Sequence, residues 1–495
     1  MQIHWHRRDL RVADNRGLAA ATGALDADDA GEPGPVVPLF VFDRDVLAHA
    51  GPPRVAFMLD ALASLRAAYR ERGSDLLVRR GDPRGVVPEV AASFDADRVT
   101  WASEVSGLGR ERDAAVRRAL DDDGVARESV EDHLLHEPGS IRTNQGEVYS
   151  VFTYFWKKWR DRAKLDPVDP PADADLLDTA EIAADYSLPT LADLGFDEPE
   201  ADVPPASTDA ARELLAGFCE SDIYDYDERR DYPADGCTSR LSAHLKFGTI
   251  GLREVYAATE SAMARAKDRD DGDDDSGPEA EADELGPAQE SVRTFQSQLA
   301  WREFYAQVLY FNPEIVSQNY KAYEEPIEWR NDADELAAWK RGETGYPIVD
   351  AGMRQLDREG YVHNRPRQVV ASFLTKHLLV DWRKGARHFE HQLVDHDPAV
   401  NYGNWQWVAS TGTDTVDVRI FDPVAQMDKY DPDADYVREY VPELQDVPPE
   451  KAVEWPTLDA AERARFAPDY PDPIVDRDGA YERARRVFET ALGQR

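Results

Sequence analysis

Positive charge is scarce in this sequence of 495 residues. It contains 58 Lys and Arg against 97 Asp and Glu, a net charge of −39, and 11 of the basic residues are lysine. Because phosphate binding needs a positive surface, this balance alone argues against a nucleic-acid partner. Acidic, lysine-poor surfaces also stay hydrated in concentrated salt, where the Debye length falls to about 3 Å at 1 M. We favour a halophilic source, in which case the net charge excludes no partner.

Cysteine and long apolar runs are also rare. The two cysteines, Cys219 and Cys237, are too few for a disulfide framework or a cysteine-rich metal site. The N-terminus MQIHWHRRDL lacks the apolar centre of a signal peptide, and no run of about 18 apolar residues occurs. We therefore expect a soluble cytoplasmic protein.

The first third of the chain alternates short apolar runs with helical patterns. The predicted strands are 2–7, 36–43, 75–80 and 98–102, and the predicted helices between them include 53–72 and 109–121. This alternation predicts an α/β domain built on a doubly wound parallel sheet. No glycine-rich phosphate loop follows the first strand, so a nucleotide site of the usual kind is not indicated.

The rest of the chain reads as helical. A stretch rich in Pro, Asp and Ala at 166–205 predicts an extended linker. The charged segment 267–287, interrupted by Gly and Pro, predicts a disordered acidic loop. The predicted helices are 208–219, 239–245, 252–263, 289–310, 332–341, 347–358, 365–379, 385–393 and 458–466.

Tryptophan is abundant, with 11 in the chain, and several lie among polar neighbours. A single tryptophan is usually a core residue. On a helix, however, Gln298 and Trp301 share a face, and so do Trp301 and Tyr305. An amide beside a stacking ring is suited to binding a flat heterocycle that forms hydrogen bonds. The alternative interpretation is that these residues form an aromatic core with a polar rim.

Six segments carry a more specific signal. They are HWHRRDLRVADN (4–15), TSRLSAHLKFG (238–248), WREFY (301–305), TGYPIVDAGMRQL (344–356), HNR (363–365) and NWQWVASTGTD (404–414). Together, and in this order, they resemble the photolyase/cryptochrome family over the whole chain. The resemblance implies an α/β antenna domain at 1–165, the linker at 166–205, and a helical domain at 206–495 that binds flavin adenine dinucleotide (FAD) and the DNA lesion.

The resemblance also implies a light-driven reaction. Reduced FAD, excited directly or through a second antenna chromophore of folate or deazaflavin type, would give an electron to a cyclobutane pyrimidine dimer flipped out of damaged DNA. Both carbon–carbon bonds of the dimer's ring would open and the electron would return. The enzyme would thus be a carbon–carbon lyase, in which we expect no metal, and we expect a monomer.

The family's cofactor residues can be carried over by position. The positions expected to hold FAD are Tyr226, Thr238, Ser239, Arg240, Leu241, Ser242, Asn364, Arg367, Asp395, Asp397 and Asn401. The resemblance implies that Tyr226 and the run 238–242 hold the phosphates, and hydroxyls and amides at a helix start are suited to a pyrophosphate. Arg367 and Asp395 resemble the ion pair beside the flavin ring. Asn401 resembles the residue facing flavin N5, where an Asp could supply a proton and an amide cannot.

The resemblance assigns the electron relay and the lesion side as well. Trp405, Trp382 and Trp329 match the family's relay from flavin to surface. The lesion-side positions are Arg230, Gln298, Trp301, Arg302, Asn364, Arg365, Gln368 and Trp407. Trp301 and Trp407 would stack on the flipped dimer. Arg230, Arg302 and Arg365 are candidate phosphate contacts. For each of them, an ion pair on the surface or inside the domain is an equally good interpretation.

Two lesion-side positions depart from the family's common pattern. Gln298 stands where a Glu usually bonds the thymine edges, and Gln368 stands where a Met usually packs on the dimer. Gln368 and the stretch 401–405 are similar to DASH-type cryptochromes, which favour single-stranded DNA. A photolyase for the (6-4) lesion is a minor alternative, because the expected pair of histidines is not evident. A blue-light photoreceptor with the same FAD and relay is the main alternative, although the chain ends at Arg495 without the usual signalling extension.

Overall fold

The computed structural model describes residues 1–25, 34–182, 187–273, 285–414 and 418–493. Their contacts divide the chain into two compact units. The first comprises Met1–Pro199, Val203–Asp227 and Thr238–Pro313, and the second comprises Glu200–Asp202, Glu228–Cys237 and Glu314–Arg495. Below, these are called the first and second unit. The division into antenna, linker and flavin domains stays a prediction.

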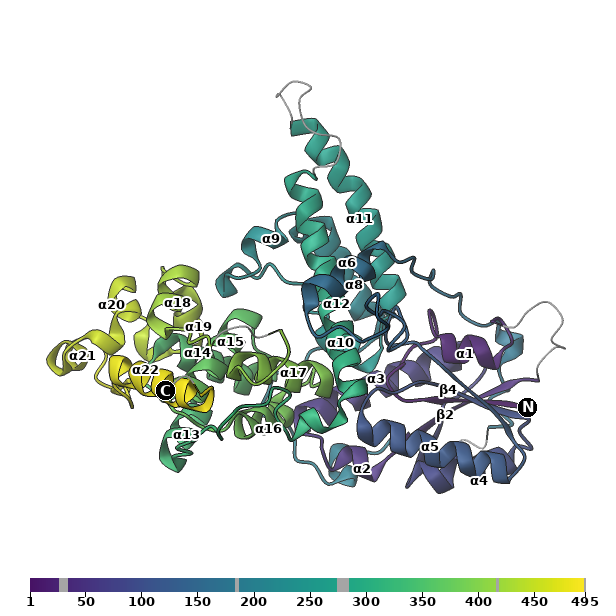
Figure 1. Cartoon of the computed structure of the whole chain (residues 1–495). Coiled ribbons are helices and arrows are strands. Elements are labelled where there is room, and N and C mark those ends of the chain that lie inside the picture. Colours follow the sequence, from purple (N-terminus) through teal and green to yellow (C-terminus); the bar gives the residue numbers. More distant parts are fainter. Residues whose placement is uncertain (26–33, 183–186, 274–284, 415–417, 494–495) are drawn as a thin grey trace. The chain divides into compact units, whose positions relative to one another are not determined.

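The first unit contains a five-stranded parallel sheet in the order β3-β2-β1-β4-β5. The strands are β1 Gln2–His6, β2 Val36–Phe42, β3 Leu77–Arg80, β4 Arg98–Ala102 and β5 Ala126–Val130. Figure 1 shows α1 (Arg16–Ala21) on one face of the sheet, with α4 (Pro83–Ser93) and α5 (Gly107–Asp122) on the other. The doubly wound parallel sheet predicted from the sequence is therefore confirmed.

The remaining helices of this part of the chain follow the sheet or connect its strands. They are α2 Arg44–Leu47, α3 Pro52–Glu71, α6 Phe152–Asp161, α7 Leu191–Leu194, α8 Thr208–Glu220, α9 Tyr226–Arg229, α10 Ser242–Phe247, α11 Leu252–Asp273 and α12 Pro287–Phe311. Helices α11 and α12 pack side by side (Figure 1). The predicted linker is extended over much of its length, and the Leu177 amide N–H donates to the Val36 carbonyl of β2.

The described residues of the second unit are helical, with no β-strand among them. The helices are α13 Ala333–Arg341, α14 Pro347–Glu359, α15 Asn364–Ser372, α16 Trp382–Gln392, α17 Pro398–Ala409, α18 Pro423–Tyr430, α19 Asp435–Tyr440, α20 Pro449–Val453, α21 Ala460–Phe466 and α22 Arg477–Ala491. Helices α14 to α17 and α19 bury one apolar core that includes Trp339, Trp382 and Trp405.

The helix predicted at 365–379 is confirmed as α15, which continues into a π-helical turn at Phe373–His377. One local prediction was wrong. Helix α11 continues to Asp273, so residues 267–273 are helical, although the sequence predicted a disordered loop there; residues 274–284 of that loop lie outside the described part of the chain. Among the elements that were not predicted are strand β5 and helices α6, α17, α18, α19 and α22. In the part of the chain that the structure describes, no helix combines the length and apolarity needed to cross a membrane.

Candidate functional site

The residues predicted to bind ligands fall in both units, and each group is described within its own unit. Tyr226, the run 238–242, Gln298, Trp301 and Arg302 belong to the first unit. The second unit carries Arg230, Trp329, Asn364, Arg365, Arg367, Gln368, Trp382, Asp395, Asp397, Asn401, Trp405 and Trp407.

Helix α17 positions three of the second unit's residues, and both of its ends are anchored. Asp397 is the N-cap: its carboxylate accepts hydrogen bonds from the amides of Ala399 and Val400 at 2.9 and 3.3 Å, with Pro398 in the first turn. These bonds satisfy amides that have no partner inside the helix. Asp397 therefore has a structural role in this unit, whatever it binds.

The other end of α17 is held by a buried lysine that the sequence did not reveal. The Lys376 amine lies in the π-helical turn and donates to the Ala409 carbonyl and the Ser410 hydroxyl, both at 2.9 Å. It also lies 3.6 Å from the centre of the Phe488 ring. Burial lowers the pKa of Lys376 well below its usual range. A lysine within the apolar run ASFLTKHLLV was the available signal.

The structure brings Arg367 and Asp395 together as an ion pair, with 3.5 Å between Nη2 and Oδ2. Two further atoms of this pair, Arg367 Nε and Asp395 Oδ1, are buried and have no hydrogen-bond partner. An unsatisfied buried donor or acceptor costs about 1–3 kcal/mol, so such a pair calls for a ligand that supplies both an acceptor and a donor. A flavin ring edge has both, and these residues fit that group.

Asn401 lies on α17 and is buried. One N–H of its side-chain amide donates to the Ala386 carbonyl of α16 at 3.1 Å, which fixes the plane of the amide. A fixed neutral amide can form hydrogen bonds to a ligand, but it cannot deliver a proton as a carboxylic acid can.

Trp405 is enclosed by aromatic rings and by a glycine. Its ring meets Phe389 edge-on at 5.1 Å and Trp339 at 6.2 Å between centroids. A Cβ added at Gly385 would lie 2.2 Å from Trp405 Cη2, so only glycine leaves room for the indole. Trp339 was not among the predicted site residues, and its place against Trp405 depends on contacts that sequence does not show.

The other two relay tryptophans have different surroundings. Trp382 is fully buried and donates from Nε1 to Asn319 Oδ1 at 2.9 Å. Trp329 is partly buried and meets Phe488 edge-on at 6.0 Å. Among the described residues, no two of Trp405, Trp382 and Trp329 are in direct ring contact, so the order of the relay stays a prediction.

The second unit's lesion-side residues form a small polar cluster. Arg365 donates to Asp231 Oδ2 at 2.6 Å and to Gln368 Oε1 at 3.2 Å, and its guanidinium lies 4.2 Å from the Tyr430 ring centre. Arg230 approaches Asp231 at 3.9 Å. Arg365 is thus paired within the protein, and its contact with DNA stays a prediction. Asn364, the first residue of α15, is exposed.

Trp407 has a cation beside it that the sequence did not suggest. The Arg419 guanidinium carbon lies 5.4 Å from the Trp407 ring centre. A cation over an indole is attracted by the ring's negative face, and it could also meet a phosphate of a DNA strand.

In the first unit, Trp301 is stacked on another ring. Phe152, the first residue of α6, lies parallel to it with centroids 3.7 Å apart, and Tyr305 flanks it at 5.4 Å. Trp301 itself remains only partly buried. One face of the indole is therefore fixed by protein, and a base would have to use the remaining exposed part.

The neighbours of Trp301 form their hydrogen bonds within their own unit. Arg302 donates to the carbonyls of His133 at 2.5 Å and Leu245 at 3.2 Å. Gln298 donates to the Thr294 carbonyl at 3.3 Å and to Ser297 Oγ at 3.0 Å. The geometry thus gives Arg302 a role in holding the fold, and a role toward DNA stays a prediction.

Beside Trp301 on α12 lies a buried acid that the sequence did not single out. Glu303 accepts a hydrogen bond from the Leu135 amide at 3.0 Å, and burial raises the pKa of Glu303 to about 8. At neutral pH the side chain is therefore largely protonated, which avoids an unpaired buried charge.

The predicted phosphate segment leads into α10. Arg240 adopts a positive φ of 53°, Leu241 is buried at the N-cap, and Ser242 is exposed in the first turn. Thr238 and Ser239 are partly buried. Tyr226 is buried against Phe218 and Phe295. Of these positions, Arg240 and Ser242 are exposed, and their role toward a phosphate stays a prediction.

Comparison with known families gives two matches along the chain. A family model described as DNA photolyase matches residues 2–174, and one described as the FAD binding domain of DNA photolyase matches residues 295–490. The second match contains helices α15 and α17, which carry Arg367 and Asn401, and the turn before α17 that carries Asp395.

Individual proteins are similar over the full length. A deoxyribodipyrimidine photo-lyase from Halobacterium salinarum is 57% identical over 496 residues, covering all of both chains. Among solved structures, a class III photolyase from Agrobacterium tumefaciens has a TM-score of 0.84 and 34% identity, covering 100% of this chain and 98% of its own. An archaeal photolyase from Sulfolobus tokodaii, described with two FAD molecules, has a TM-score of 0.80 and 31% identity, covering 99% of each chain.

Proposed function

The chain belongs to the DNA photolyase family, and from this premise we propose that it is a deoxyribodipyrimidine photo-lyase, which uses blue light to repair cyclobutane pyrimidine dimers in DNA. The single observation that carries this is the full-length identity of 57% to a protein of that name. The photoreceptor alternative is not favoured, because the relative with this identity carries the lyase name.

FAD is the cofactor that the family's flavin domain implies. When bound and reduced, it supplies the light-excited electron that opens the dimer. Arg367 and Asp395 would hold the ring edge through their two unsatisfied atoms. Asn401, fixed by Ala386, would offer a hydrogen bond without supplying a proton. The run 238–242 and Tyr226 would hold the remainder of the dinucleotide.

The relay residues would let the flavin be reduced in light. An indole gives up an electron readily, so a buried series of indoles can pass one from the surface inward. Gly385 and Phe389 keep the Trp405 ring in place. The fully buried Trp382 excludes water from the middle of the route.

The lesion side would act by stacking and by hydrogen bonds. Trp301, braced by Phe152, and Trp407 would present aromatic surface to the flipped dimer. Gln298 and Gln368 would form neutral hydrogen bonds to the bases, which are weaker than those of a charged carboxylate. Arg230, Arg302 and Arg365 are the candidate phosphate contacts.

We also propose a second, light-harvesting chromophore in the α/β part. In doubly wound sheets, ligands bind beyond the carboxyl ends of the strands where the strand order reverses, which here is next to β1. Folate and deazaflavin types were predicted from the family resemblance, and the Sulfolobus tokodaii protein, described with two FAD molecules, adds a flavin to the choices. The absorption spectrum of the protein as purified would identify it. The monomeric state and the cytoplasmic location stay predictions.

The repair activity can be tested directly. Purified, chemically reduced protein is illuminated with oligonucleotides that contain a cyclobutane dimer or a (6-4) lesion, in single- and double-stranded form, and the remaining lesions are counted. We expect loss of cyclobutane dimers in blue light and none in darkness. Unchanged dimer counts in both strand forms would overturn the proposal, and loss of the (6-4) lesion alone would reassign the substrate.

A further inference from the structure

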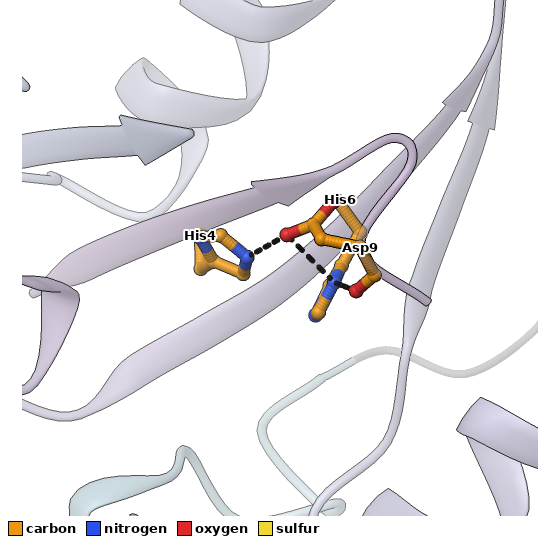
Figure 2. A group of neighbouring side chains, drawn as sticks. All are labelled: His4, His6 and Asp9. Carbon is orange, nitrogen blue, oxygen red and sulfur yellow. Dashed lines mark hydrogen bonds and ion pairs between the residues drawn. The ribbon is translucent and has the colours of Figure 1, made fainter. Parts of the chain in front are cut away.

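Strand β1 carries two histidines at positions where a central parallel strand usually buries apolar side chains. His4 and His6 point to the same face, opposite the core that contains Ile3 and Trp5, and both are fully buried. Asp9, in the loop after the strand, is fully buried with them. Figure 2 shows the Asp9 carboxylate between the two imidazoles.

The Asp9 carboxylate has an unusual set of partners for a buried acid. Its ion-pair partners in the described part of the chain are the two histidines, and no arginine or lysine joins them. It also accepts hydrogen bonds from the Arg7 amide at 2.7 Å and from Asn15 Nδ2 at 3.1 Å. A buried carboxylate without a permanent cation is expensive, and a bound cation would relieve that cost.

The three candidate ligand atoms lie close together. Asp9 Oδ2 lies 2.8 Å from His4 Nε2 and 3.5 Å from His6 Nδ1, and all three atoms lie within 4.8 Å of one another. With metal–ligand bonds of about 2.1 Å, separations of 2.8 and 3.5 Å subtend roughly 84° and 113° at a common ion. The first angle is close to the octahedral value and the second is close to the tetrahedral value.

The outer nitrogens of both rings are already bonded to oxygen. His4 Nδ1 lies 3.1 Å from Thr100 Oγ1, and His6 Nε2 lies 2.7 Å from the Tyr69 hydroxyl. Metal-binding histidines almost always donate their second N–H to such an oxygen, which fixes the tautomer and the ring orientation. The Thr100 hydroxyl in turn donates a hydrogen bond to the Gly17 carbonyl at 2.8 Å, so its oxygen is free to accept from His4 Nδ1.

We propose that His4, His6 and Asp9 form a structural site for one divalent transition-metal ion, with Zn²⁺ as the ion that suits two imidazoles and a carboxylate. On binding, the ring protons move to His4 Nδ1 and His6 Nε2, so two neutral rings and one carboxylate face the ion. The Asp9 carbonyl, 2.9 Å from His6 Nδ1, is in reach as a fourth ligand.

The ion would stiffen the loop between β1 and α1. That loop supports the end of α10: the Leu10 amide donates to the Phe247 carbonyl, and Arg11 Nη1 donates to the Gly248 carbonyl, both at 3.1 Å. Helix α10 directly follows the run 238–242. The site is therefore distinct from the predicted flavin residues and supports the segment that carries some of them.

Metal content tests the proposal without any activity measurement. The chain is made without a histidine tag, dialysed against a chelator, and titrated with Zn²⁺ alone by calorimetry. We expect one ion per chain and a rise in Tm with added Zn²⁺, because an ion that binds only the folded state stabilises it. The double variant His4→Val/His6→Phe should take up none, whereas His391→Gln, which alters an exposed histidine on α16, should match the unaltered chain.

Equal uptake by the unaltered chain and the double variant, or no uptake by either, would overturn the proposal and leave a hydrogen-bonded network. If the double variant does not fold, X-ray absorption on the unaltered Zn²⁺-loaded chain decides. Two imidazole nitrogens at about 2.0–2.1 Å support the site, and a spectrum without imidazole scattering contradicts it.

Discussion

The two units hold their predicted site residues in different ways. In the second unit the predicted flavin and relay residues are held by close neighbours: Arg367 pairs with Asp395, and the Trp405 ring fills the space that a side chain at Gly385 would need. In the first unit Gln298 and Trp301 are only partly buried, and Gln298 bonds only within its own helix. Electron transfer needs constant distances, whereas a lesion pocket must admit and release a substrate.

The largest effect should come from crowding the relay. Gly385→Ala places a Cβ about where the Trp405 ring lies. Such overpacking typically lowers stability by about 1–3 kcal/mol, and we expect it to displace the ring. We expect photoreduction in blue light to slow by about tenfold or more, measured as the rate of flavin bleaching.

The matched control is Gly217→Ala on α8, where an added Cβ meets nothing within 4 Å. It should leave photoreduction unchanged and stabilise the chain slightly, by about 0.5–1 kcal/mol, since alanine is the better helix former. Equal photoreduction in both variants would show that the close fit around Trp405 has no part in the relay.

On the lesion side, we expect an effect on DNA binding alone. Trp301→Ala removes one stacking surface, which is worth roughly 1–3 kcal/mol, or about 5- to 150-fold in Kd for dimer-containing DNA. Photoreduction should not change, because the relay lies in the other unit. Tyr481→Ala, an exposed aromatic on α22, is the control and should bind normally. If Trp301→Ala binds the lesion as tightly as the unaltered chain, the ring faces protein only.

The smallest effect concerns the buried acid beside Trp301. Burial raises the pKa of Glu303 from 4.5 to about 8, so the folded chain keeps a proton that the unfolded chain loses. Stability from this group is full below pH 4.5 and is lost as the pH rises to about 8. Glu303→Gln has no proton to lose, so the Tm of this variant relative to the unaltered chain should increase as the pH rises from 5 to 8.

Glu290→Gln, an exposed position on the same helix, is the control for this titration. Its Tm should follow that of the unaltered chain at every pH. A constant difference between Glu303→Gln and the unaltered chain across the range would show that Glu303 is already ionised in the fold.

Sequence pattern predicted the sheet well and some helices poorly, for physical reasons. Strand β2 is a continuous apolar run, and β1 and β4 carry Ile, Val and Trp between polar residues; the predicted bounds of all three differ from the structure by at most one residue. Strand β5, ARESV, is a largely exposed edge strand with no apolar run to mark it. Helix α17 contains Asn, Gly, Val and Trp, which are weak helix formers, and its stability comes from the Asp397 cap, Lys376 and packing.

Sequence motifs predicted which residues belong to the candidate site. They did not predict which side chains surround those residues. Phe152 lies against Trp301 although 149 positions separate them in the chain, and Tyr69 and Thr100 reach His6 and His4 from other elements. Such pairings depend on the tertiary fold. No local spacing in a single sequence records them.

One variant tests the central claim most directly, namely that the relay serves only to reduce the flavin while the pocket performs repair. Trp382→Phe is compared with the unaltered chain in two assays: photoreduction of oxidised flavin, and dimer repair after chemical reduction. We expect photoreduction to fall by about tenfold or more while repair per absorbed photon stays within about twofold. Equal losses in both assays, or no loss of photoreduction, would contradict the account.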